Sequence, residues 1–491
     1  MRPEPFHTNH LWALTVSLFI LFLSGCAGQG GGERQLGGDQ LDYGASSTFP
    51  VPPEIHDNVD FWRHVYGIWS RNQLVVHDDE HMGVIYEISR IPGSMQSGLT
   101  ESQKEWVDSR ATYYASRLRD LESRLRSGQS PTAGDRDLIA KFENNGGTAA
   151  IHGAAERVRT QRGMRERFKR GLEISGRYDQ AFRDIMRQRG VPEDLAYLPH
   201  VESSFQTNAR SSVGACGVWQ FMPGTGKLYM SINNSVDERL DPILAADGAA
   251  RYLSEAHRKL GSWPLAITSY NHGQGGIAKA RSQCGNDIGR IVKTYKGQYF
   301  GFASRNFYSE FIAAREVARN PQRYFPEGVN YESPWPHDRL VLQSSMPANH
   351  IAQHYGTSTD RLAALNLHLR DSALNGRSML PSGSTIWLPQ GSTRRKGAPP
   401  PGFLASTTPT ASPLPSASSR VAVAKANVSE LPKTPISVTS GKTRYHVVKP
   451  QETLYRVAVE NGLSVEELRR LNKMPPGDNH IQPGQKLKVG F

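Results

Sequence analysis

Two segments of this chain repeat one another, and that repeat most constrains what the chain can fold into. The stretch HYGTSTDRLAALN (354–366) aligns without gaps with ENGLSVEELRRLN (460–472), and the two share Gly, Ser, Leu, Leu and Asn. Residues 391–441 between them are rich in Pro, Ser, Thr and Ala, a composition too polar to form a packed core. The sequence therefore predicts a modular protein with two similar small units separated by a linker.

Each copy of the repeat lies between two predicted strands, which gives a strand–helix–helix–strand unit. RLVLQ and LPSGSTIWLP flank the first copy, and RYHVVKP and IQPGQKLKV flank the second. We place these units at residues 338–390 and 443–491. The first is a degenerate copy, because Arg361 replaces the helix-capping Glu of the second and an insertion precedes its last strand. The pattern resembles the LysM module, which binds the N-acetylated glycan of peptidoglycan or chitin. Without that resemblance, each unit could be any small α/β interaction module.

The rest of the chain shows mainly helical patterns. At 491 residues it is too long for one ordinary core, so we expect two to four domains. Residues 51–175 show helical periodicity with no competing strand pattern, and a capping box at Thr100 and Gln103 predicts the start of a helix that runs to Arg126. Residues 176–330 alternate helical runs with loops rich in Gly, Ser and Asn. The predicted fold is mainly α, with a helical N-terminal region and small βααβ modules at the C-terminal end.

The N-terminus carries an apolar run, LWALTVSLFILFLSGC, that is too short to span a bilayer comfortably. It resembles a bacterial lipoprotein signal, in which residues 1–25 are removed and Cys26 receives the lipid, including palmitate. Because residue 27 is Ala and not Asp, the resemblance implies the periplasmic face of the outer membrane. The alternative is an ordinary signal peptide with a chance cysteine. Residues 26–50 read as a flexible Gly-rich tether.

The net charge of +12 favours either an anionic partner or simply a solvated surface. Nucleic acid is an improbable partner, because the basic residues lack interleaved stacking aromatics and the chain is predicted to be exported. No Cys/His spacing suits zinc, and PGTGK at 223–227 lacks the spacing of a phosphate-binding loop. We expect no metal and no cofactor, and a monomer.

A single acid, Glu202, lies beside an apolar, glycine-rich stretch. VPEDLAYLPHVESSF is predicted to be helical, and Leu195, Leu198 and Glu202 then share one face. Burial on that face disfavours the ionised carboxylate and raises its pKa, so that the acid can act as a general acid near neutral pH. The alternative is a Glu at a helix end that faces solvent.

Three motifs follow one another with specific spacing: ESSF at 202–205, GACGVWQFMPGTG at 214–226 and ITSYNHG at 267–273. In this order they resemble family 1 lytic transglycosylases. The resemblance implies a lysozyme-like α-helical domain that cleaves the MurNAc-β-1,4-GlcNAc bond of peptidoglycan glycan strands without water and leaves 1,6-anhydro-MurNAc ends. The acid protonates the glycosidic oxygen and then takes a proton from the C6 hydroxyl of MurNAc. The acetamido group of the substrate replaces the second carboxylate of ordinary glycosidases.

The resemblance assigns roles to individual residues. Glu202 is the catalytic acid and base, and Ser211 helps to hold the acetamido-assisted intermediate. Tyr270 is expected near Glu202, and Asn271 near the substrate. A loop hydroxyl that caps a turn would explain Ser211 equally well, and a helix end closed by Gly273 would explain the Tyr-Asn pair.

The glycine-rich loop supplies further candidates. By resemblance, Gln220 bonds an N-acetyl group and Met222 lies beneath a sugar ring, although Met222 could instead pack in the core. Gly214 and Gly217 would let the backbone approach the sugar closely. Trp219 fits the core better than a sugar-stacking position.

Two features depart from the family pattern. The family often has Glu-Thr-Arg-x-Tyr late in the domain, whereas this chain has ASRNFYSEF at 303–311, with Tyr308 one position from the family Tyr. Cys216 stands where the family usually has Ser or Ala. Because the expected compartment is oxidising, Cys216 and Cys284 could form a disulfide or remain two small thiols.

Two other functions compete with the transglycosylase. A hydrolytic muramidase would need a second carboxylate or a fixed water, and Asp237, Glu238 or Asp241 could fold back to provide the carboxylate. A peptidoglycan-binding lipoprotein that has lost activity would keep the glycan groove without the chemistry.

Overall fold

The computed structural model describes residues 46–94, 98–397, 444–448, 454, 457, 461, 465–475, 481–482 and 484–490. The predicted signal peptide, the predicted lipidation site Cys26 and most of the predicted linker lie outside the described residues. The chain divides into two compact units. The first comprises residues up to Arg165 together with Ile288–Tyr295, and the second comprises residues 166–287 and everything from Lys296 onwards.

The first unit contains a three-stranded antiparallel sheet, so the prediction of a purely helical region at 51–175 is wrong. Its strands, in the order β2-β1-β3, are β2 (Ile85–Arg90), β1 (Gln73–Asp78) and β3 (Val158–Arg162). The central strand β1 is buried at nearly every position. Its apolar residues therefore form a continuous run and not the alternation that identifies a half-buried strand.

A long helix, α2 (Glu101–Arg126), packs its apolar stripe against this sheet. The predicted capping box is present, with Thr100 accepting from the Gln103 amide and the Gln103 side chain accepting from the Thr100 amide. The other helices of this unit are η1 (Pro53–Ile55), α1 (His56–Gly67), α3 (Ala133–Ala140), η2 (Gly147–Ile151), η3 (Ala154–Arg157) and α11 (Ile288–Thr294).

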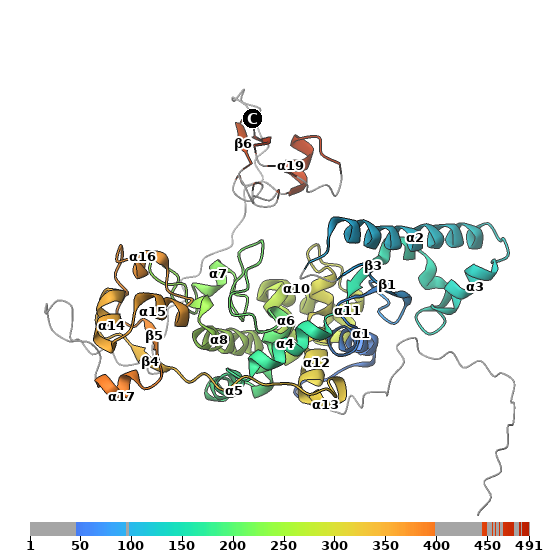
Figure 1. Ribbon diagram of the computed structural model, residues 1–491. Helices are drawn as coiled ribbons and strands as arrows, with labels where there is room; N and C mark the ends of the chain where they lie inside the picture. The colour runs from blue at the N-terminus through green and yellow to red at the C-terminus, as the bar shows by residue number, and fades with distance from the viewer. Residues whose placement is uncertain are drawn as a thin grey trace, which may run out of the picture. The chain divides into compact units, whose positions relative to one another are not determined.

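The second unit begins with a bundle of helices that carries all the candidate catalytic residues (Figure 1). They are α4 (Arg165–Ser175), α5 (Asp179–Gln188), η4 (Glu193–Tyr197), α6 (Leu198–Glu202), α7 (Pro223–Gly226), η5 (Glu238–Leu240), α8 (Pro242–Leu260), α9 (Trp263–His272), α10 (Gln274–Cys284), α12 (Phe302–Arg319) and α13 (Pro321–Tyr324). Helix α4, which precedes the predicted domain start at residue 176, packs on the same bundle: Arg167 Nε donates to Ser204 Oγ at 3.1 Å.

The first repeat forms the predicted α/β module at the end of this unit. Strands β4 (Asp338–Val341) and β5 (Thr385–Leu388) pair antiparallel, with α14 (Ala348–Tyr355) and α15 (Thr359–Leu365) between them in sequence. The insertion before the last strand contains a short helix, α16 (Asp371–Leu374). In the second repeat, β6 (Arg444–Val447) pairs with β7 (Lys486–Gly490), and α19 (Val465–Leu471) lies between them in sequence. The expected mainly helical fold with small α/β modules is confirmed.

The Asn that both repeats share has the same function in both. Asn366 accepts from the Trp387 amide at 2.6 Å and donates to the carbonyls of Leu362 and Trp387. Asn472 accepts from the Lys488 amide at 2.7 Å and donates to the carbonyls of residues 468 and 488. In each module this side chain closes a helix and joins it to the last strand, so the repeat preserves a structural bond.

The predicted linker begins too early at residue 391. Residues 392–396 form a short helix, α17 (Ser392–Lys396), and Asp338 of β4 accepts from the amides of Gly391 and Thr393 at 3.0 and 2.8 Å. This carboxylate holds the segment against the first module, so the module extends to Gly397.

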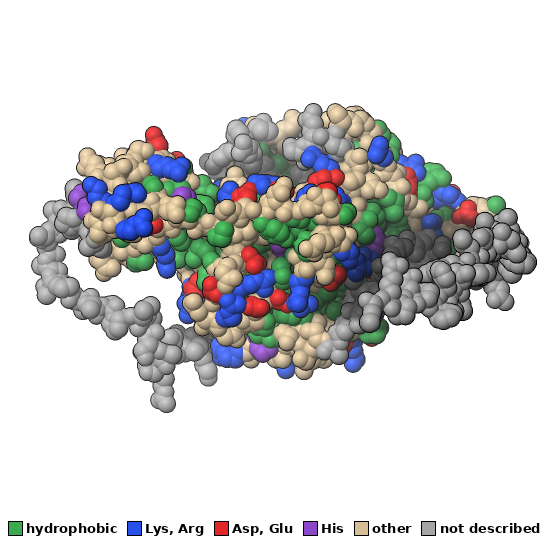
Figure 2. Space-filling model, turned by 60° about the horizontal axis from the view of Figure 1, so that its bottom comes forward, with side chains coloured by type: hydrophobic (Ala, Val, Ile, Leu, Met, Phe, Trp, Pro, Cys, Tyr) green, Lys and Arg blue, Asp and Glu red, His purple; other side chains and the backbone are tan. Residues whose placement is uncertain are grey.

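On the central part of the face in Figure 2, basic side chains lie among acidic ones. Among the described residues, Arg187 forms ion pairs with Asp184 and Glu193, and Arg315 forms one with Asp194. None of the helices that the structure describes is long and apolar enough to cross a bilayer.

Candidate active site

Glu202 is the last residue of α6, and its carboxyl lies in a largely apolar environment. Leu195 and Leu198, predicted to share its face, are fully buried, while Glu202 itself is half-buried. Pro199 lies in the first turn of α6, where the missing N–H costs nothing, so the kink that a mid-helix proline would cause does not arise. Burial, with a smaller contribution from the negative charge of Glu310, raises the pKa of Glu202 from 4.5 to about 8.

Ion pairs hold the segment that precedes Glu202. Asp194 of η4 accepts from Arg315 at 2.6 Å and from Arg319 at 3.0 Å, both on α12. Arg183 of α5 approaches the same carboxylate at 3.4 Å. These contacts fix η4, and therefore α6, against two longer helices, which limits where the Glu202 carboxyl can lie.

The turn after Glu202 has an unusual backbone. Ser204 and Phe205 have φ values of 53° and 59°, in the left-handed region that residues other than Gly rarely adopt. Ser203 Oγ donates to the Val218 carbonyl at 2.8 Å, which joins this turn to the glycine-rich loop. A Cβ on Gly171 of α4 would lie 3.0 Å from the Ser204 carbonyl, so the helix packs directly against the turn. Strained residues of this kind persist where surrounding contacts enforce them, and they gather at functional sites.

The glycine-rich loop is tied together by its own polar groups. Ser211 Oγ accepts from the Ala215 amide at 2.9 Å, which is the turn-capping role that competed with a substrate role. Gln220 has φ 47°, and its side-chain Nε2 donates to the Gly217 carbonyl at 2.7 Å. Met222 is 41% exposed, which excludes core packing and leaves its thioether accessible to a ligand. The substrate contacts of all three residues stay predictions.

The structure bears on two other expectations for this loop. Trp219 is fully buried, so its predicted place in the core is confirmed. A Cβ on Gly217 would lie 1.9 Å from the Arg239 carbonyl, so this glycine is needed for contact between two loops, and its approach to a sugar stays a prediction. Gly214 is exposed, with φ 92°, and its role stays a prediction.

Tyr270 on α9 lies close enough to Glu202 to feel its charge. Its hydroxyl donates to the Trp219 carbonyl at 2.9 Å, and its ring packs edge-on against Phe221 and Tyr252. Burial, followed by the charge of Glu202, raises the pKa of Tyr270 well above its usual range. The phenol therefore stays protonated beside Glu202, which agrees with the position that the resemblance implied.

Asn271 is held by Ser304, which lies in the segment that departs from the family's Glu-Thr-Arg-x-Tyr pattern. Ser304 Oγ donates to Asn271 Oδ1 at 2.9 Å and lies 3.1 Å from His272 Nδ1. Ser304 occupies the Thr position of the family's Glu-Thr-Arg-x-Tyr pattern, so the hydroxyl survives although the preceding Glu does not. A Ser in place of Thr was the signal that could have identified it. Tyr308 is buried within α12.

Of the two possibilities for Cys216 and Cys284, a disulfide or two thiols, the structure has two thiols. Cys216 is buried inside the glycine-rich loop, where its amide donates to the Phe221 carbonyl at 3.3 Å. Cys284 ends α10. The two cysteines are therefore parts of separate local structures, and sequence spacing alone did not reveal that.

The three acids that a hydrolytic enzyme would have to recruit have other partners. Asp237 pairs with Arg239, Glu238 accepts from the Ser231 amide, and Asp241 caps α8. Glu310, which sequence reasoning missed, is the acid whose charge acts on Glu202. Within the described ranges, no group of three or more His, Cys, Asp or Glu side chains is arranged to hold a metal.

Comparison with known families now identifies the domains. Residues 180–291 match the transglycosylase SLT domain family, and residues 349–389 and 446–490 match the LysM domain family. The region that carries Glu202 is therefore similar to SLT domains, and both repeats are similar to LysM domains. The chain is homologous to membrane-bound lytic murein transglycosylase D of Escherichia coli K12, with 24% identity over 317 residues that cover 62% of this chain and 61% of that protein.

Two other similarities are more local. Membrane-bound lytic murein transglycosylase F 2 of Alkalilimnicola ehrlichii is 35% identical over 122 residues, which cover 23% of this chain and 26% of that protein. Among solved structures, the 70 kDa soluble lytic transglycosylase SLT70 of Escherichia coli aligns with 18% identity and a TM-score of 0.27, over 50% of this chain and 40% of that one. The chain thus spans less than two thirds of the length of each of these relatives.

Proposed function

We propose that this chain is a lytic transglycosylase that cleaves the MurNAc-β-1,4-GlcNAc bond of peptidoglycan and leaves 1,6-anhydro-MurNAc ends. The observation that carries the proposal is the raised pKa of Glu202, about 8, beside the protonated Tyr270. An acid with such a pKa is mostly protonated at neutral pH, as the first step requires.

The reaction needs a single carboxyl group that works twice. Glu202 gives its proton to the glycosidic oxygen as the bond from that oxygen to C1 of MurNAc breaks. The resulting carboxylate then takes the proton of the C6 hydroxyl, whose oxygen bonds to C1 and closes the anhydro ring. The proton lost in the first step is regained in the second, so no water is consumed. Occupation of Asp237, Glu238 and Asp241 by other partners supports this route over hydrolysis.

Site roles follow the same proposal. Tyr270, held by its bond to the Trp219 carbonyl, keeps a neutral phenol near Glu202, and Asn271, anchored by Ser304, contacts the glycan. Ser211, Gln220 and Met222 line the path of the sugars on the glycine-rich loop. The lysozyme-like fold is part of this proposal.

Mass analysis of muropeptides released from purified sacculi tests the reaction. The wild-type chain should release anhydro ends, and Glu202→Gln should release none. Reducing ends would instead identify a hydrolase, and no release by the folded wild-type chain would leave a glycan-binding protein. Glu193→Gln, which changes an exposed carboxylate on η4, is the matched control and should retain activity.

We also propose that the protein is a lipoprotein of the outer membrane that faces the periplasm, anchored through Cys26. The LWALTVSLFILFLSGC stretch supports this, as does the membrane-bound name of its relatives. Cells fed labelled palmitate should incorporate the label into the wild-type chain and not into Cys26→Ala. Membrane fractionation should then recover the wild-type chain with the outer membrane.

A further inference from the structure

The first LysM module is joined to the catalytic bundle by backbone bonds. Val236 and Leu369 form an antiparallel bridge, flanked by Asp237 N to His368 O at 2.7 Å and Arg370 N to Ser235 O at 2.9 Å. The side chain of Val236 is part of the hydrophobic core of the module. The insertion that made this repeat look degenerate therefore contains the residues that make these bonds, 368–370, which we call the docking segment.

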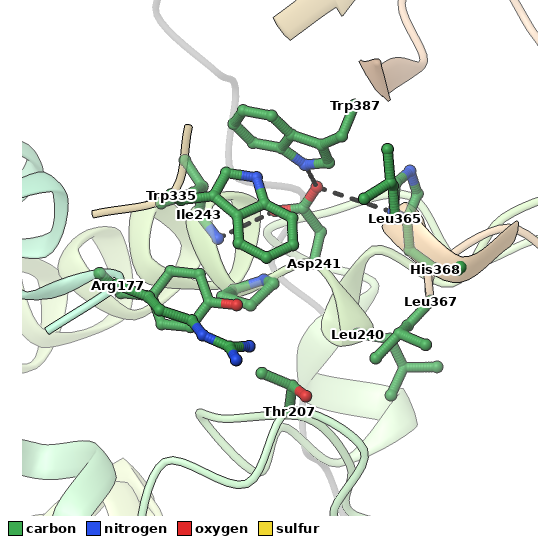
Figure 3. Close-up of a pocket in the computed structure, with 13 residues that line it drawn as sticks. Arg177, Thr207, Leu240, Asp241, Ile243, Trp335, Leu365, Leu367, His368 and Trp387 are labelled. Carbon is green, nitrogen blue, oxygen red and sulfur yellow. Dashed lines mark hydrogen bonds and ion pairs between the residues drawn. The ribbon is translucent and has the colours of Figure 1, made fainter. Parts of the chain in front are cut away.

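A second contact joins the two parts at the cavity in Figure 3. Asp241 caps α8 by accepting from the amides of Ile243 and Leu244, and its other oxygen accepts from Trp387 Nε1 at 2.6 Å. His368 Nδ1 lies 3.7 Å from the same oxygen. One buried carboxylate thus serves a helix of the catalytic bundle and the last strand of the module, which fixes one against the other.

The docking segment also reaches the glycine-rich loop through a chain of charges. Arg370 Nη2 of the module donates to Asp237 Oδ2 at 3.1 Å. Asp237 accepts two bonds from Arg239, both at 2.9 Å. Arg239 Nη1 in turn donates to the carbonyls of Gly214 at 2.8 Å and Phe221 at 2.9 Å, at the two ends of the loop that carries Gln220.

This chain of contacts is buried where it meets the loop. Asp237 is 3% and Arg239 is 6% exposed, so neither group can exchange its partner for water without cost. Close packing at Gly217, whose Cβ would meet the Arg239 carbonyl at 1.9 Å, transmits any shift of Arg239 to the loop backbone. Arg370 is the most exposed of the three residues. Its positive charge pairs with the Asp237 carboxylate, which also pairs with Arg239.

We infer that Asp237, Arg239 and Arg370 are positioning residues, through which the first LysM module holds the loop of Ser211, Gln220 and Met222 in the geometry that catalysis requires. The module is then a structural part of the active site and not an independent wall-binding arm. This inference rests on the proposed transglycosylase function for its effect on catalysis, but its structural part stands without that function.

The decisive experiment compares Arg370→Ala with Arg377→Ala in the full chain. Arg377 lies in the same insertion and carries the same charge, but its exposed guanidinium bonds Asn375 in its own turn. The buried thiol of Cys216 reports on the loop, since its rate of alkylation, measured by peptide mass spectrometry, rises when the loop opens.

Arg370→Ala should increase Cys216 alkylation and the amide exchange of the glycine-rich loop by roughly tenfold, and reduce kcat/KM for muropeptide release by a similar factor. Amide hydrogen exchange in α9 should not change, because that helix is not part of the chain of contacts through Asp237, Arg239 and Arg370. Arg377→Ala should match the wild type in every measurement. Arg370→Lys keeps the positive charge but lacks the several N–H donors of the guanidinium, so it should give intermediate values. It replaces Arg370→Ala in the test if the Ala variant fails to fold.

Equal Cys216 alkylation and equal amide exchange of the loop in the Arg370 and Arg377 variants would refute the inference that Arg370 helps to hold the loop. A wild-type chain that released no anhydro ends would overturn the proposed function instead, while the alkylation and exchange data would still decide whether the module holds the loop. The two failures are therefore distinguishable.

Discussion

Replacing Glu202 with Gln should stabilise the protein at neutral and alkaline pH although it abolishes catalysis. In the unfolded chain this carboxyl loses its proton near pH 4.5, and in the folded chain near pH 8. Between these values the folded state holds the extra proton, so the free energy of unfolding falls by about 1.4 kcal/mol for each unit of rising pH. Gln has no proton to lose and escapes this penalty.

The size of the effect follows from the same two values. Over the 2.5 units from pH 4.5 to pH 7 the wild type loses at most about 3 kcal/mol relative to the Gln variant, and over the full window to pH 8 about 5 kcal/mol. These are upper values, because the carboxyl is half-buried and the remaining water screens its charge.

Urea unfolding of the full chain, followed by tryptophan fluorescence at pH 5, 7 and 8.5, measures this difference for the transition of the catalytic unit. The free-energy gap between Glu202→Gln and the wild type should widen as the pH rises. A gap that stayed constant from pH 5 to pH 8.5 would mean that the carboxyl is not shielded, and the argument for its role as an acid would fail.

Three further predictions test the surroundings of this carboxyl. Glu310→Gln removes a negative charge that raises the pKa of Glu202, so the alkaline limb of the pH–rate profile should move to lower pH, and an unchanged limb would contradict the influence of Glu310. Tyr270→Phe leaves the buried Trp219 carbonyl without its donor and should cost about 1–3 kcal/mol in urea unfolding, whereas the same change at Tyr299, 80% exposed, should cost almost nothing. Ser304→Ala frees Asn271 and should lower kcat/KM for muropeptide release by roughly tenfold, with Ser304→Thr retaining most of the activity.

Much of this protein could be predicted from short stretches of sequence. The capping box at Thr100 needs residues only three positions apart, and the buried residues Leu195 and Leu198 lie in the short segment that ends at Glu202. The repeat predicted both small modules, because local strand and helix patterns with a shared Asn recur in each copy. Such features depend on neighbours along the chain, so the sequence displays them directly.

Other features arise only when distant segments meet. Strand β1 was missed because both of its faces are buried in the folded protein, so its sequence lacks the alternating pattern, and because its partner β3 lies far along the chain. Local spacing likewise could not decide whether Cys216 and Cys284 form a bond. The sequence by itself determined which acid performs the proposed chemistry and which modules accompany it. Tertiary packing decided what acts on that acid and its neighbours. The charge of Glu310 acts on Glu202, the hydroxyl of Ser304 holds Asn271, and the arginine of the first LysM module bonds Asp237. All three lie more than a hundred residues from Glu202 in the sequence, so only folding could bring these contacts about.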